Sequence, residues 1–162
     1  MIPDVLAGAD IPGGGLGSDA QLWSDCEFLY AQGIRVIVSL EFPGASMKRI
    51  CEALGIRWVN FPVPDFGTPP LDDSFISLVD MCLDACRGEL PVCIHCRAGI
   101  GRTGMLLTCL YGRLTDVDAA TAVAHVRSCR TAIESADQHH FVERFFSLRH
   151  GRSDEDSQDA VD

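Results

Sequence analysis

The chain has 162 residues, of which 47% are hydrophobic and 22% are charged, and its formal net charge is −10. These proportions are ordinary for a globular protein, and the length allows one domain with a substantial core. The acidic balance, with Lys48 as the single lysine, makes nucleic acid an unexpected partner. No apolar run approaches a membrane span and no basic segment opens the chain, so we expect a cytoplasmic protein without a membrane partner.

The distribution of charge also predicts a domain boundary. Residues 151–162 hold five acidic side chains and one arginine, and they show no apolar periodicity. This pattern is typical of a solvated, flexible tail. We therefore expect one domain over residues 1–150 and an acidic tail over residues 151–162.

The first half of the chain alternates between helical and strand patterns. The stretch "PGGGLGS" (12–18) imitates a phosphate-binding loop but lacks the Gly-Lys-Ser/Thr ending, so we interpret it as a flexible lead into a helix. Ser18 and Gln21 form a capping box at the start of that helix, and Gly55 ends a second one. The β-branched apolar run "IRVIVSL" between them predicts a buried strand, and "IRWVNFPV" after the second helix is the next expected strand. The expected helices span residues 18–32 and 46–54, and the expected strands span 34–40 and 56–63.

A Pro-rich loop at residues 62–70 leads into the second half of the chain. Apolar periodicity then predicts a helix capped by Asp72 or Asp73, followed by a short buried strand and three further helices. The expected helices span residues 72–87, 104–114, 117–130 and 138–150, and the expected strand spans 91–96. Alternation of this kind predicts an α/β fold with a mainly parallel central sheet flanked by helices.

The stretch "IHCRAGIGRTG" (94–104) joins the last strand to the next helix through a glycine-rich turn. Backbone N–H groups of such a turn and the dipole of the helix form an anion site, and glycines let the backbone approach the ligand. Arg102 can donate two hydrogen bonds to a tetrahedral oxyanion, and Cys96 lies where positive potential stabilises a thiolate. We predict that this thiolate attacks bound phosphate, with His95 bracing the turn rather than acting as a base.

A metal or redox site is the competing interpretation of these cysteines. Cys93 and Cys96 have Cys-x-x-Cys spacing, but no second Cys/His pair with metal-ligand spacing follows. Several of the eight cysteines lie in apolar patterns, where a reduced cysteine acts as a small hydrophobic residue. We expect free thiols, no metal and no cofactor.

The motif "HCRAGIGRT" resembles the signature of the protein tyrosine phosphatase superfamily, His-Cys-x5-Arg-Ser/Thr, and matches it at every fixed position. The short chain and the loop "VPDFGTPP" make it similar to the small atypical dual-specificity phosphatases. The resemblance implies a strand, phosphate loop and helix in succession and hydrolysis through a phosphocysteine intermediate. The chain is too short for the elements that build a deep phosphotyrosine cleft, so a shallow pocket compatible with phosphotyrosine, phosphoserine and phosphothreonine is expected.

The resemblance also assigns roles to single residues. It makes Cys96 the nucleophile, Arg102 the phosphate clamp and Thr103 a hydrogen-bond donor that eases departure of the thiolate. It makes Asp65 the general acid, a role worth about 10²–10⁴-fold in rate. The phosphate-binding residues it implies are Arg97, Ala98, Gly99, Ile100, Gly101 and Arg102.

Asp65 and Gln138 could each have a purely structural role instead of a catalytic one. Asp65 could simply form a turn after Pro64. Gln138 lies where some members of the superfamily position the hydrolytic water, but Ser135 and Gln138 also form a capping box that would account for the glutamine. Glu41 and Glu134 are further candidates for the cleft, which the sequence leaves undecided.

The sequence thus predicts a phosphatase acting on phosphorylated proteins. One alternative is a phosphatase for a non-protein substrate, either an RNA 5′-triphosphate or a phosphoinositide, which the acidic surface disfavours. Another is a module that binds phosphoproteins without turnover. Against this module stands the presence of Cys96, Arg102 and Asp65 together, of which a non-catalytic relative would be expected to have lost one.

Overall fold

The computed structural model describes residues 5–15 and 17–155. Its elements are β1 (Leu6–Ala9), the 3-10 turn η1 (Pro12–Gly15), α1 (Asp19–Ala31), β2 (Val36–Ser39), α2 (Met47–Leu54), β3 (Arg57–Asn60), α3 (Asp73–Arg87), β4 (Val92–His95), α4 (Gly101–Thr115), α5 (Ala119–Cys129) and α6 (Ala136–Glu155). The predicted α/β fold with a parallel sheet is confirmed.

The sheet has the strand order β1-β4-β2-β3, and every pair is parallel. Ser39 of β2 is in register with His95 of β4, which in turn pairs with Ala9 of β1. The carboxyl ends of these strands therefore meet at one edge. In open α/β sheets this is the edge where ligands bind.

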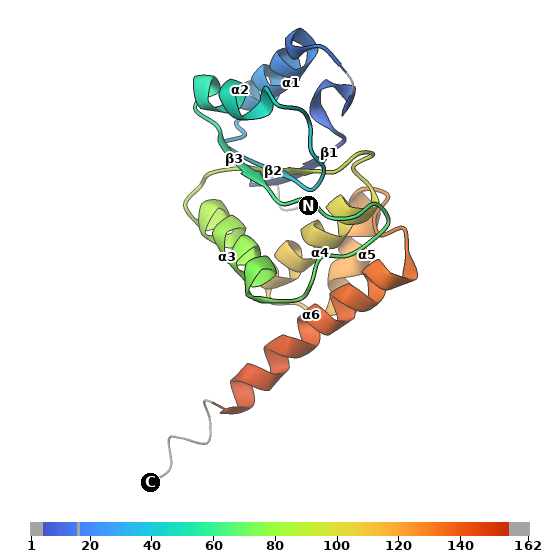
Figure 1. The fold of residues 1–162 in the computed structure, drawn as a ribbon. Helices are drawn as coiled ribbons and strands as arrows, with labels where there is room; N and C mark the ends of the chain where they lie inside the picture. The colour runs from blue at the N-terminus through green and yellow to red at the C-terminus, as the bar shows by residue number, and fades with distance from the viewer. Residues whose placement is uncertain (1–4, 16, 156–162) are drawn as a thin grey trace.

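Helices cover both faces of the sheet, with α1 and α2 on one side and α3, α4, α5 and α6 on the other (Figure 1). Strands buried on both faces are expected to be mostly apolar, and the short β2 and β4 are apolar except for their last residues, Ser39 and His95. The larger core contains Phe75 of α3, whose ring forms T-shaped contacts with Phe141 and Phe145 of α6 at centroid distances of 4.9 and 5.8 Å. This packing holds the start of α6 close to the loop that precedes α3.

Capping residues in the sequence predicted most helix ends correctly. The Ser18 hydroxyl accepts a hydrogen bond from the Gln21 N–H at 3.3 Å and so caps α1, which is one half of the predicted capping box; the Gln21 side chain instead donates to Asp25 at 3.0 Å. Asp72, rather than Asp73, caps α3 by accepting from the N–H groups of Ser74 and Phe75. Gly55 ends α2 with a left-handed φ of 73°.

Three features differ from the sequence prediction. The strand β1 (LAGA), which has no β-branched or aromatic residue, was not predicted. The glycine-rich stretch before α1 is a turn packed on that helix, in which the Gly13 N–H donates to the Asp25 carboxylate at 2.7 Å, so the interpretation of a flexible lead is wrong for these residues. Finally, α4 begins at Gly101 instead of 104.

The predicted start of the acidic tail lies inside a helix. The backbone of α6 continues to Glu155, five residues beyond the predicted boundary at residue 150. Residues 156–162 lie outside the described residues, so the rest of the predicted tail stays a prediction.

Candidate active site

The turn between β4 and α4 is fixed by contacts with the N-terminal segment. Gly99 has a φ of 70°, and a Cβ there would lie 2.4 Å from the carbonyl oxygen of Ala9, so only glycine fits. The Ile11 N–H donates to the carbonyl of Arg97 at 3.1 Å. On the other side, the Arg130 guanidinium donates to the carbonyl of Gly99. The unpredicted strand β1 thus helps to shape the turn.

Cys96 lies directly after β4, at the start of this turn, and only 3% of its surface is exposed. The following helix begins at Gly101, so its first backbone N–H groups, which have no intrahelical partner, face the same region. Cys93, two residues before the strand ends, is different. Burial raises the pKa of its thiol to about 12, so it remains protonated in the core and is a poor metal ligand.

His95 braces the turn through a buried chain of hydrogen bonds. The Trp58 indole N–H donates to the Ser39 hydroxyl at 2.8 Å, and that hydroxyl lies 2.6 Å from Nε2 of His95. Nδ1 of His95 lies 3.3 Å from the carbonyl oxygen of Cys96. Burial lowers the pKa of His95 to about 4, so we assign the neutral tautomer with the proton on Nδ1. In this tautomer the hydrogen bonds run in one direction, from Trp58 through Ser39 and His95 to the carbonyl of Cys96. They therefore fix the position of that carbonyl.

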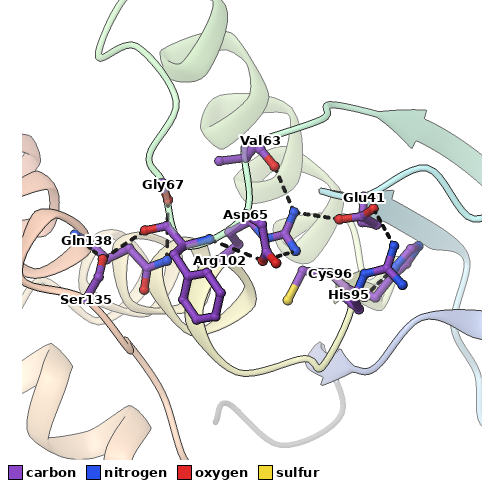
Figure 2. Close-up of polar contacts among 11 residues, drawn as sticks. Glu41, Val63, Asp65, Gly67, His95, Cys96, Arg102, Ser135 and Gln138 are labelled. Atoms are coloured by element: carbon purple, nitrogen blue, oxygen red, sulfur yellow. Dashed lines mark hydrogen bonds and ion pairs between the residues drawn. The ribbon is translucent and has the colours of Figure 1, made fainter. Parts of the chain in front are cut away.

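Arg102 lies in the first turn of α4, where only 3% of the residue is exposed, and its guanidinium has three partners. Nη1 donates to the Glu41 carboxylate at 2.7 Å and to the carbonyl of Val63 at 2.8 Å. Nη2 donates to the Asp65 carboxylate at 2.7 Å. Figure 2 shows these three acceptors converging on the arginine. A buried guanidinium held in this way presents a fixed fork of donors.

Glu41, which the sequence left undecided, is a member of the site. Its two oxygens join Arg102 and Arg97, the latter at 3.1 Å. The hydrogen bond from Arg102 is the main cause that holds the pKa of Glu41 below its ordinary value, so it stays ionised. Glu41 follows the end of β2 closely, and this position at the carboxyl edge of the sheet is the signal that could have identified it.

Asp65 lies in the loop between β3 and α3, and its side chain is 58% exposed. Its Oδ1 accepts from Arg102 and, at 3.2 Å, from the N–H of Phe66. The structure therefore brings Asp65 to the turn that holds Cys96, although 31 residues separate the two in the chain. An exposed carboxyl group at this edge can exchange protons with a ligand.

Thr103 lies next to Arg102 and is completely buried. Its hydroxyl oxygen has no hydrogen-bond partner among the described residues. A buried hydroxyl without a partner normally costs stability, and such exceptions concentrate at functional sites.

Gln138 lies at the start of α6 and is fully buried. Its backbone N–H donates to the Ser135 hydroxyl at 3.2 Å, and its side-chain oxygen accepts from the Glu134 N–H at 2.9 Å. The capping function predicted for the pair is therefore present. The Gln138 amide and the Glu134 carboxylate also lie against Gly101, since a Cβ there would lie 2.9 and 2.5 Å from their oxygens.

Among the described residues, no group of His, Cys, Asp and Glu side chains could hold a metal ion, and no helix is long and apolar enough to cross a membrane. No disulfide is present in the described part of the chain, which includes all eight cysteines. The arrangement gathers a cysteine, an arginine with a fixed fork and an exposed carboxyl group around one turn, which is a set suited to transfer of a phosphoryl group.

The chain resembles known phosphatases in both sequence and fold. It is 34% identical over 76 residues to dual specificity protein phosphatase CDC14C of Symphalangus syndactylus, which covers 47% of this chain and 15% of the relative. It is 31% identical over 119 residues to protein tyrosine phosphatase domain-containing protein 1 of Mus musculus, which covers 64% of this chain and 16% of the relative. The chain thus spans only a small part of the length of these relatives.

Solved structures share the fold. The crystal structure of Tk-PTP in the active form has a TM-score of 0.73 at 20% identity and covers 91% of this chain and 99% of that one. Human DUSP28 has a TM-score of 0.66 at 17% identity and covers 91% of this chain and 94% of that one. Residues 10–114, more than half of the chain, match the family model described as "Polymorphic toxin system, DSP-PTPase phosphatase". The chain belongs to this family of DSP-PTPase phosphatases.

Proposed function

We propose that the chain hydrolyses phosphate monoesters on protein side chains in two steps, through a phosphoryl group held on Cys96 and without a metal. The observation that carries the proposal is the pairing of the buried Arg102 with Asp65 at 2.7 Å beside the turn that begins at Cys96. It supports one site in which phosphate binding, nucleophilic attack and proton transfer take place together.

Binding of the substrate would exchange one partner of Arg102. A phosphate oxygen accepts from Nη2 in place of Asp65, while Nη1 keeps its bonds to Glu41 and Val63. The remaining phosphate oxygens accept from the backbone N–H groups of residues 97–102 and the start of α4. The exchange frees the carboxyl group of Asp65 close to the ester oxygen.

In the first step the Cys96 thiolate attacks phosphorus. The S–P bond forms as the P–O ester bond breaks, and its electron pair goes to the leaving oxygen. Asp65, which takes up a proton from solvent once it has left Arg102, donates that proton to the leaving oxygen, because an alkoxide or phenolate is a poor leaving group.

In the second step a water molecule attacks the phosphoryl group on sulfur. Asp65, now a carboxylate, takes a proton from this water, and the P–S bond breaks to return the thiolate. The unpartnered hydroxyl of Thr103 is available to donate to the departing sulfur. Gln138 and Glu134, which lie against Gly101, are on the side from which the water would come.

Phosphotyrosine is the substrate group that the rim of the site favours. Phe66, next to the proposed acid, is 61% exposed and offers an apolar surface to an aromatic leaving group. Phosphoserine and phosphothreonine would also reach a shallow site. A phosphoinositide is less favoured because Arg97, the basic residue available for a second phosphate, is paired with Glu41.

The test is hydrolysis of p-nitrophenyl phosphate in the presence of EDTA. We expect activity in the wild type, none in Cys96→Ser and a fall of about 10²–10⁴-fold in Asp65→Asn. The control is Cys129→Ser, since that cysteine is exposed and lies at the end of α5. Binding of a phosphotyrosine peptide without any turnover by the wild type would instead identify a phosphoprotein-binding module.

A further inference from the structure

Two side chains at the start of α6 contact the loop that carries Asp65. The Ser135 hydroxyl donates to the carbonyl of Phe66 at 3.0 Å, and the Gln138 amide donates to the carbonyl of Gly67 at 3.3 Å. Figure 2 shows both residues reaching this loop on the side away from Glu41. We call these two hydrogen bonds the cap–loop contact.

Capping of α6 does not require the cap–loop contact. As caps, Ser135 and Gln138 use their side-chain oxygens as acceptors, for the N–H groups of Gln138 and Glu134. The proton of the serine hydroxyl and those of the glutamine amide are left over. These protons are donated to the carbonyls of Phe66 and Gly67, which lie 69 and 71 residues earlier in the chain, in the loop between β3 and α3.

The receiving loop needs outside support. Phe66 has a φ of 54°, a left-handed conformation that costs energy in any residue other than glycine. Burial of its side chain does not fix this conformation, because the ring is 61% exposed. The Gly67 N–H donates to the carbonyl of Pro64 at 3.0 Å, so the loop closes as a tight turn around Asp65. Hydrogen bonds to the carbonyls of Phe66 and Gly67 select the orientation of this turn.

We propose that Ser135 and Gln138 are positioning residues that hold Asp65 over the phosphate site through the cap–loop contact. The inference rests on the proposed function, since it assumes that Asp65 is the acid of the first step. It assigns to these residues a role beyond capping α6 and distinct from placing the hydrolytic water.

The dependence of rate on the leaving group separates this role from a purely structural one. Protonation matters most when the leaving group is basic, as with phenyl phosphate, and little when it is acidic, as with 2,4-dinitrophenyl phosphate. A misplaced Asp65 therefore slows the first reaction and spares the second. General damage to the site slows both alike.

The variants are chosen at Ser135, where capping and donation can be separated. Ser135→Asp keeps a strong cap acceptor but has no proton to donate, and Ser135→Gly removes the donor without adding charge at a position where glycine is tolerated. Ser135→Thr keeps both functions. Ser147→Ala is the matched control, because that hydroxyl donates within α6, to the carbonyl of Glu143 at 3.0 Å.

We expect Ser135→Asp and Ser135→Gly to lower kcat/KM for phenyl phosphate about tenfold, which corresponds to the loss of one hydrogen bond. With 2,4-dinitrophenyl phosphate the same variants should stay within about twofold of the wild type, which also shows that they fold. Ser135→Thr and Ser147→Ala should match the wild type with both substrates. In an Asp65→Asn background, Ser135→Gly should cause no further loss, because it acts through the missing acid.

Two contrary results are distinguishable. If Asp65→Asn slows phenyl phosphate far more than 2,4-dinitrophenyl phosphate while both Ser135 variants match the wild type, or lower both rates equally, the cap–loop role is overturned and Asp65 stands as the acid. If Asp65→Asn affects both substrates equally, the assignment of the acid fails and the positioning role fails with it.

Discussion

Nη2 of Arg102 donates a hydrogen bond to Oδ1 of Asp65 at 2.7 Å, so the residue proposed to bind phosphate is paired with the residue proposed to protonate the leaving group. The arginine is buried and anchored by Glu41 and the carbonyl of Val63, whereas the aspartate is 58% exposed. The aspartate is therefore the partner that moves when an anion competes for the arginine.

This competition predicts opposite effects on binding and turnover. In Asp65→Asn the amide oxygen competes for Arg102 more weakly than the carboxylate does, so we expect inorganic phosphate to inhibit at several-fold lower concentration. The same variant should lose about 10²–10⁴-fold in kcat. Inhibition constants measured against p-nitrophenyl phosphate in both proteins test the point. Weaker inhibition by phosphate in Asp65→Asn would show that the pair does not compete with the ligand.

The buried His95 predicts that stability falls as the solution becomes acidic. Its pKa is lowered to about 4 by burial, whereas an exposed histidine has a value near 6.5. Between these values the unfolded chain binds the proton and the folded chain does not. The contribution to stability is therefore complete above about pH 6.5 and is lost as the pH falls toward 4, with about 2 kcal/mol lost between pH 7 and pH 5.

Urea unfolding at pH 7 and pH 5 measures this loss, and His95→Asn is the comparison. The variant should be less stable than the wild type at pH 7 but should lose about 2 kcal/mol less on acidification. An equal loss in both proteins would mean that other groups cause the pH dependence.

The unpartnered hydroxyl of Thr103 gives a prediction in which stability and activity separate. Thr103→Val replaces the hydroxyl by a methyl group of similar size, so stability should stay equal or rise by about 1 kcal/mol. Breakdown of the phosphoenzyme should slow, so that a burst of p-nitrophenol precedes a reduced steady rate. A normal steady rate without a burst would remove Thr103 from the second step.

The close approach of Gly99 to Ala9 can be measured against a matched glycine. Gly99 and Gly55 have φ angles of 70° and 73°, but a Cβ at Gly55 would meet nothing within 4 Å, whereas one at Gly99 would lie 2.4 Å from a carbonyl oxygen. Gly55→Ala should therefore cost about 1–2 kcal/mol of unfolding free energy, the ordinary penalty of the left-handed region. Gly99→Ala should cost clearly more and abolish turnover, and equal losses in the two variants would contradict the proposed packing.

Local patterns in the sequence were sufficient for most of the fold. Capping residues and apolar periodicity located the helices, and the β-branched run in β2 located a buried strand. Strand β1 was not predicted because its residues, Leu6–Ala9, show neither a β-branched run nor an alternation of apolar and polar residues. They form a strand only because β4 pairs with them, and that pairing is a long-range contact.

The candidate site also contains one part that local sequence predicts and another that depends on long-range contacts. The residues from His95 to Thr103 could be identified because they are contiguous and their chemistry depends on their spacing. Glu41 meets Arg102 across 61 residues, and Ser135 meets Phe66 across 69. Such pairs depend on how the elements pack, so the sequence could offer Glu41 only as a candidate and Ser135 only as a cap.

The most direct test of the account is detection of the phosphoryl group on Cys96. The wild type and Thr103→Val would be mixed with p-nitrophenyl phosphate, quenched within milliseconds and digested for mass spectrometry. We predict a phosphoryl group on the peptide containing Cys96, transient in the wild type and accumulated in Thr103→Val. Continued turnover by Cys96→Ser, with no phosphorylated cysteine in the wild type, would contradict the proposed mechanism.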